Sequence, residues 1–136
     1  MRVHIVLDLD AVDAYICDNG LPQKAMLVAE LMQSVADNDG IVVIPGTVFQ
    51  TLAARGKEER DRLLHLVTDP DSIVVVPPTQ VTETLEIAEL AERHGIDPGL
   101  AHALIIARDN DAGLATFGPD KASATGVIRP ENVFQI

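Results

Sequence analysis

The sequence predicts an α/β fold, a three-layer α/β/α sandwich with a central, mostly parallel sheet. Short apolar segments alternate along the chain with longer segments of helical periodicity, a pattern typical of parallel strands covered by helices. The first three of these segments are rich in Val, Ile and Leu and do not alternate with polar residues in a strict pattern, as expected for strands buried on both faces. With 136 residues, of which 47% are hydrophobic, we expect one domain spanning residues 1–136.

The first strand is predicted at residues 3–7 (VHIVL), and a short helix follows from about residue 11 to residue 17. Segment 21–40 has the pattern of an amphipathic helix. A proline in its first turn and an Asn-Asp-Gly sequence at its end mark its limits. The predicted buried face consists of Leu27, Leu31 and Val35.

The second strand is predicted at 41–45 (IVVIP). Thr47 then has the position of an N-cap, and Gln50 three residues later would complete a capping box. A further helix is expected from about residue 58 to residue 67, before the third strand at 72–77 (SIVVVP).

Two more helices and two short strands are expected in the last third of the chain. Thr79 is the predicted cap of the first helix, and Gly95 stands where a left-handed C-terminal residue is favoured. Asp97-Pro98 has the pattern of an N-cap followed by the first helical residue. The last strands are predicted at 114–117 (LATF) and near Val127-Ile128.

The composition limits the classes of function. The formal net charge of −11 disfavours RNA as a partner, although it leaves room for a local site. No apolar run is long enough to span a bilayer, and no signal-peptide pattern is visible. The lone Cys17 excludes an internal disulfide. A cytoplasmic protein fits these features.

One segment, ARGKEERDR, concentrates basic residues. It is a candidate surface for a substrate or a protein partner. The alternative is a solvated helix of mixed charge, because acidic residues alternate with the basic ones. The basic residues of this surface are Arg55, Lys57, Arg60 and Arg62.

Acidic residues follow the predicted strands. Asp8 and Asp10 come directly after the first strand, and the segment from Thr116 to Asp120 ends a later one. Ligands of parallel sheets bind beyond the carboxyl ends of the strands, so we expect these segments to converge. Carboxylates brought together there favour Mg²⁺ or Mn²⁺.

Each of these side chains also has a structural interpretation. Asp10 could cap the first helix, and Asp13 could lie in its first turn. Asp120 follows Gly-Pro and could belong to a turn. His102 lies in the apolar sequence AHALIIA and could be a hydrogen-bonded core residue.

The segment Asp8-Leu9-Asp10-Ala11-Val12 matches the DxDx[TV] signature of haloacid-dehalogenase-like phosphatases. This resemblance implies Asp8 as the phosphorylated nucleophile and Asp10 as the acid/base. The late part of that family's pattern is missing, since no acidic pair follows Lys121.

A second resemblance covers nearly the whole chain. The order of elements, together with IVVIPGTVFQTL, AHALIIA and LATFGPD, resembles the PIN domain of VapC-like toxin ribonucleases. The resemblance implies a Mg²⁺- or Mn²⁺-dependent endoribonuclease, a homodimer and an antitoxin partner. It makes Asp8 and Asp10 candidate catalytic residues, and Asp8 and Asp120 candidate metal ligands.

Most acids of that family's site are replaced in this sequence. The second, third and fourth acidic positions fall on Thr51, His102 and Gly118, while Asp8 matches the first. The resemblance therefore implies an impaired or altered nuclease. The alternatives are a non-catalytic module for dimerisation or antitoxin binding, and the small phosphatase acting through Asp8.

Overall fold

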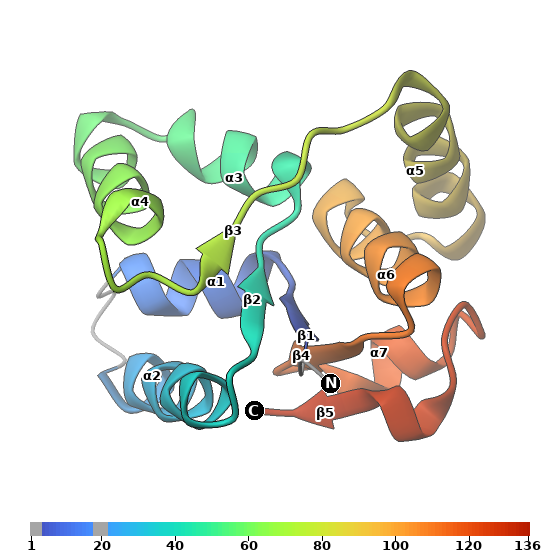
Figure 1. Ribbon diagram of the computed structural model, residues 1–136. Coiled ribbons are helices and arrows are strands. Elements are labelled where there is room, and N and C mark those ends of the chain that lie inside the picture. Colours follow the sequence, from blue (N-terminus) through green and yellow to red (C-terminus); the bar gives the residue numbers. More distant parts are fainter. Residues whose placement is uncertain (1–3, 18–21) are drawn as a thin grey trace.

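The computed structural model describes residues 4–17 and 22–136. Within these residues, five strands form one sheet in the order β3-β2-β1-β4-β5, and all pairings are parallel (Figure 1). The strands are β1 (His4–Leu7), β2 (Ile41–Val43), β3 (Val74–Val75), β4 (Gly113–Thr116) and β5 (Val133–Gln135). The helices are α1 (Leu9–Ile16), α2 (Pro22–Asp37), α3 (Gly46–Ala53), α4 (Lys57–Thr68), α5 (Val81–His94), α6 (Pro98–Asn110) and α7 (Pro119–Ser123). A 3-10 turn (Pro130–Asn132) precedes β5.

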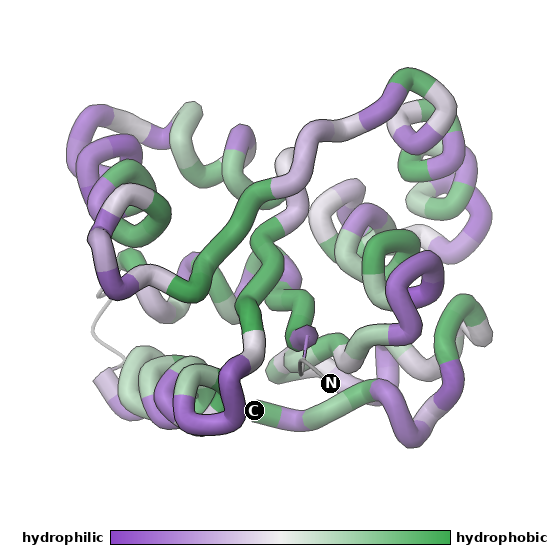
Figure 2. Tube along the Cα trace, viewed as in Figure 1, coloured by the Kyte–Doolittle hydropathy of each residue, from purple (hydrophilic) through white to green (hydrophobic). Residues whose placement is uncertain are grey.

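Two apolar clusters lie on opposite faces of the sheet. Val6 packs in the cluster with α5, α6 and α7, whereas Ile5 and Leu7 pack in the cluster with α1 to α4. Because side chains alternate along a strand, this division buries β1 on both faces. The predicted α/β/α sandwich is confirmed, and hydrophobic residues follow the central strands (Figure 2).

The register of the central strands places two polar segments side by side. Leu7 of β1 is paired with Ala115 of β4. The residues that follow them, Asp8 and Thr116, therefore meet at the carboxyl edge of the sheet. The predicted convergence of these two segments is confirmed.

Several predicted helix limits are confirmed. Gly95 ends α5 in the left-handed region, with φ of 61°. Asp97 caps α6, because its Oδ1 accepts a hydrogen bond of 2.9 Å from the backbone N of Leu100. Pro98 is the first residue of that helix, where the missing N–H is not needed.

The predicted cap of α3 is wrong. The helix begins at Gly46, after Pro45, and no side chain caps it. Thr47 lies inside the first turn, where its hydroxyl contacts the ring of His102 instead of a backbone N–H. The cap predicted at Thr79 is also wrong, since Gln80 precedes α5 without a side-chain hydrogen bond.

The buried face of α2 differs by about one residue from the face predicted from the sequence. Leu27 is exposed, whereas Val28 and Val35 are buried and Leu31 packs beside them. The strand predicted near Val127-Ile128 is wrong as well. Ile128 enters the core from a loop, and β5 follows later at residues 133–135.

Val3 and Leu21, which belong to predicted segments, lie outside the described residues. Among the residues that are described, no helix combines the length and the hydropathy required to cross a membrane.

Candidate functional site

Asp8 lies at the carboxyl edge of the sheet, and both of its carboxyl oxygens are engaged. Oδ1 accepts a hydrogen bond of 3.0 Å from the backbone N of Ala11, which makes Asp8 the N-cap of α1. Oδ2 accepts a hydrogen bond of 2.6 Å from Oγ1 of Thr116. The same hydroxyl accepts from the backbone N of Gly118 at 3.0 Å, so its own proton is directed to Asp8.

This arrangement corrects the predicted cap. Asp8 caps the first helix, and Asp10, for which that role was predicted, is an exposed residue of its first turn. Asp13, predicted in the first turn, lies later in α1 and pairs with Arg55 at 2.7 Å. Asp8 therefore has a definite structural role.

Burial raises the pKa of Asp8. The side chain is 4% exposed, and removal from water disfavours its charged form. The hydrogen bonds from Thr116 and Ala11 act in the opposite direction, whereas the negative charges of Asp10 and Asp97 raise the pKa further. The described groups that act on the pKa of this carboxyl group are neutral donors and other acids, and none of them is a cation.

Asp97 is the acidic neighbour that the sequence did not connect with Asp8. A Cβ added at Gly99 would lie 2.9 Å from Oδ1 of Asp97 and 3.2 Å from Cβ of Leu9. The start of α6 can therefore approach the start of α1 only because residue 99 has no side chain. Asp97 uses Oδ1 for its own helix cap. The signal available in the sequence was Asp-Pro-Gly, which indicated a helix start and not a contact with the first strand.

The residues at the positions where the PIN resemblance implies further acids have other roles or contacts in the structure. Thr51 is exposed and donates a hydrogen bond of 2.8 Å to the carbonyl of Thr47 in its own helix. Gly118 is exposed beyond β4. His102 is buried, as its core interpretation predicted, and contacts Thr47 and Glu83.

These residues do not fit the Mg²⁺ or Mn²⁺ site that the resemblance implies. In the described part of the chain, no group of three or more His, Cys, Asp or Glu side chains has an arrangement that could hold a metal ion. Mg²⁺ requires near-octahedral oxygen ligation, and the carboxyl oxygens of Asp8 are already engaged. Asp120 is an exposed residue in the first turn of α7. A metal shared by Asp8 and Asp120 stays a prediction.

The basic segment forms a surface of mixed charge. Lys57 pairs with Asp61 at 2.8 Å, and Arg62 pairs with Glu58 at 2.6 Å, both along α4. Arg55 pairs with Asp13 of α1, as described above. Arg60 and Arg62 also donate to the backbone carbonyls of Ala53 and Ile16, and Arg55 contacts Sγ of Cys17. Most of the positive charge is therefore balanced locally, which agrees with the interpretation as a solvated helix.

A groove lies beside this segment, between α1, α2 and α4. It has a volume of about 730 Å³, and its walls include Tyr15, Met26 and Leu66. The side chain of Met26 is 61% exposed. Asp61 and Arg62 also line the groove, so its lining combines apolar and charged side chains. This combination is typical of protein interfaces.

Comparison with known proteins supports the fold. No protein-family model matches the sequence, and no curated protein matches it. Among solved structures, the chain is similar to FitAcB from Neisseria gonorrhoeae, with a TM-score of 0.56 and 17% identity over 96% of each chain. At this identity the likeness concerns the fold alone. It supports a PIN-like fold, in agreement with the order of the sheet.

Proposed function

We propose that this chain is a PIN-like protein of the toxin–antitoxin type whose nuclease activity is impaired, and that it acts mainly by binding a protein partner. The proposal rests mainly on the hydrogen bonds that the buried carboxyl group of Asp8 accepts. The one acid that matches the family's site caps a helix and accepts a hydrogen bond from Thr116. Each oxygen of this carboxyl group already accepts a hydrogen bond, and burial raises its pKa, which disfavours the charged form that binds a metal ion.

The structural neighbour supports the choice of partner. FitAcB is a toxin–antitoxin complex in which FitB is the PIN-domain toxin. We extend this to the present chain as a proposal: its partner is a protein of the antitoxin kind. The groove between α1, α2 and α4 is the proposed docking surface, and an apolar segment of the partner would contact Met26 and Tyr15.

A pair of matched variants tests the docking surface. Met26 in the groove and Leu64 on α4 are both exposed apolar residues, with exposed fractions of 61% and 58%. Leu64 is not part of the groove wall. Affinity capture from the source cells, followed by mass spectrometry, should yield a stoichiometric partner with wild type and Leu64→Asp but not with Met26→Asp. Equal capture by both variants would exclude the groove as the docking surface for the partner.

The impaired activity is tested separately with purified protein and structured and unstructured RNA. In the presence of Mg²⁺ or Mn²⁺, we expect cleavage by the wild type to be no faster than cleavage by Asp8→Ala. A rate that is clearly higher for the wild type would show a working nuclease. It would remove the central reason for treating the chain as a binding protein.

A further inference from the structure

A second pocket lies on the opposite face of the sheet from the groove, between the strands and α6. Its volume is about 240 Å³. Val6, Val43 and Val75 line it from β1, β2 and β3, and Ile106 lines it from α6. Val75 is 42% exposed, whereas Val6, Val43 and Ile106 are buried. Ile41, Pro77 and Pro78 also line the pocket and are at least partly exposed. The accessible apolar wall of the pocket therefore consists of Val75, Ile41 and the two prolines.

One end of the pocket contains a pair of polar side chains, Glu83 of α5 and His102 of α6. Nε2 of His102 lies 3.2 Å from Oε1 of Glu83. On the other side of the ring, Nδ1 accepts a hydrogen bond of 3.4 Å from the backbone N of Thr47 and lies 2.9 Å from its Oγ1. Since a backbone N–H can only donate, this network assigns the ring proton to Nε2, where it is donated to Glu83.

The charge at this end of the pocket is negative. Burial lowers the pKa of His102, and this effect outweighs the opposing effect of Glu83. The ring is therefore neutral at neutral pH and does not cancel the charge of the Glu83 carboxylate. A hydrogen bond from one neutral ring leaves Glu83 with unused acceptor capacity.

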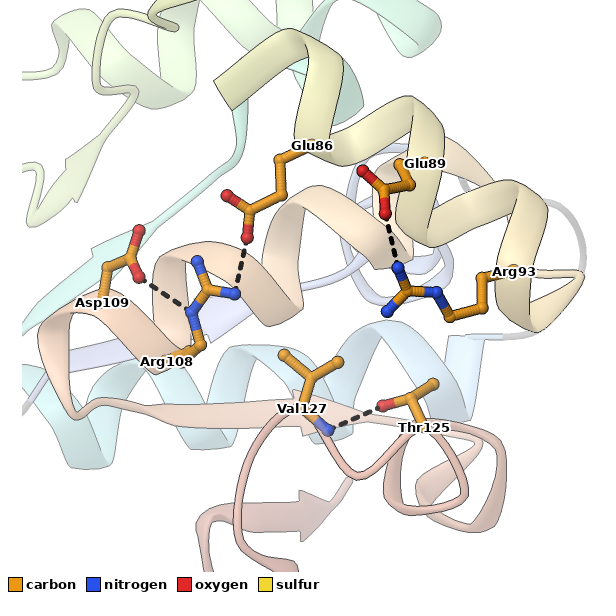
Figure 3. Close-up of polar contacts among 7 residues, drawn as sticks. All are labelled: Glu86, Glu89, Arg93, Arg108, Asp109, Thr125 and Val127. Carbon is orange, nitrogen blue, oxygen red and sulfur yellow. Dashed lines mark hydrogen bonds and ion pairs between the residues drawn. The ribbon is translucent and has the colours of Figure 1, made fainter. Parts of the chain in front are cut away.

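The position of Glu83 is fixed by the helix that carries it. Glu86, one turn further along α5, forms an ion pair of 2.6 Å with Arg108 of α6 (Figure 3). Arg108 also contacts Asp109 at 2.9 Å. Two contacts, Glu83 with His102 and Glu86 with Arg108, hold α5 against α6. The carboxylate is thus presented to the pocket by a positioned helix.

We propose that this pocket binds a small primary alkylammonium compound, with its ammonium group on Glu83 and its aliphatic chain against Ile41, Val75 and Pro77. Pockets for drug-sized ligands measure about 300–1,000 Å³, so a pocket of this size selects a smaller molecule. An apolar wall with a single anionic group matches a cation on a short chain. The net charge of −11 also attracts cations to the protein.

The test compares three probes of equal chain length by isothermal titration calorimetry at neutral pH: hexylammonium, 1-hexanol and hexanoate. A charge-assisted hydrogen bond should make hexylammonium bind at least about tenfold more tightly than hexanol. Hexanoate should bind most weakly. Equal affinity for hexylammonium and hexanol, or no binding of any probe, would overturn the proposal.

Variants localise the binding. Glu83→Gln should remove the preference for hexylammonium, whereas Glu92→Gln, which makes the same charge change on an exposed part of α5, should retain it. Val75→Phe, at the exposed edge of the pocket, should weaken the binding of all three probes. Each variant is first checked for a wild-type melting curve and NMR spectrum. Retention of the preference in a folded Glu83→Gln would contradict the assignment.

Discussion

Replacement of Thr116 by Val tests whether Asp8 is held as a structural residue. The two side chains have nearly the same shape, so the main change is the loss of the hydroxyl group. That hydroxyl donates to Oδ2 of Asp8 at 2.6 Å and accepts from the backbone N of Gly118 at 3.0 Å. Thr116 and Asp8 are 2% and 4% exposed, so water cannot readily replace the lost donor.

The expected loss of stability follows from these contacts. Leaving a buried polar group without its partner costs about 1–3 kcal/mol. The substitution removes two hydrogen bonds of the hydroxyl, one to Asp8 and one from Gly118, so we do not expect the cost to lie at the lower end of this range. We expect the free energy of unfolding to fall by about 2 kcal/mol. For a domain of this size, the melting temperature should fall by roughly 5–10 °C.

The assay is urea denaturation at neutral pH, followed by circular dichroism. Thr51→Val is the matched control, because the hydroxyl of Thr51 is exposed and bonds only within its own helix. We expect the control to change stability by no more than about 0.5 kcal/mol. If Thr116→Val is no more destabilising than Thr51→Val, then the hydrogen bond does not hold Asp8 and the structural role assigned to it is wrong.

Three further changes test other parts of the structure. Gly99→Ala should destabilise the fold by about 1–3 kcal/mol, because the added Cβ would meet Asp97. Gly118→Ala, which has open space around it, is the control and should be nearly neutral. Similar melting temperatures for the two variants would contradict the tight approach of α6 to α1. Because burial raises the pKa of Asp8 in the folded state, its protonation stabilises the fold fully below about pH 4, and this contribution is lost as the pH rises through the raised value. The stability of the wild type relative to Asp8→Asn should therefore improve from pH 7 to pH 4 in denaturation experiments, and a relative decline would refute the shift. Arg55→Ala breaks a partly exposed ion pair with Asp13 and should cost no more than about 1 kcal/mol by urea denaturation; a larger loss would show that this contact is structural.

Much of the fold could be predicted from hydrophobic patterns and helix caps. The strands β1, β2 and β4 overlap the runs VHIVL, IVVIP and LATF, since continuous apolar runs suit a sheet covered on both faces. The final strand could not be placed. Val127-Ile128 and the segment at residues 133–135 are both apolar near the end of the chain, and only the pairing with β4 decides between them.

The meeting of Asp8 with Thr116 could be predicted, but the structural role of Asp8 could not. The rule that segments at the carboxyl ends of parallel strands converge was sufficient for the first. Whether Asp8 or Asp10 caps the first helix depends on a difference of two residues in where that helix begins, which local sequence does not determine. The contact of His102 with Glu83 joins two helices whose relative angle is set by tertiary packing, so no sequence spacing could indicate it.

The most direct test of the proposed loss of the nuclease site is a Mn²⁺ titration followed by electron paramagnetic resonance of the free ion. Wild type and Asp8→Asn are compared at neutral pH and low salt. We predict that the two proteins give the same free Mn²⁺ signal at every concentration, since Asp8 is engaged by Ala11 and Thr116. Uptake of one additional equivalent of Mn²⁺ by the wild type would contradict the proposal and identify Asp8 as a metal ligand.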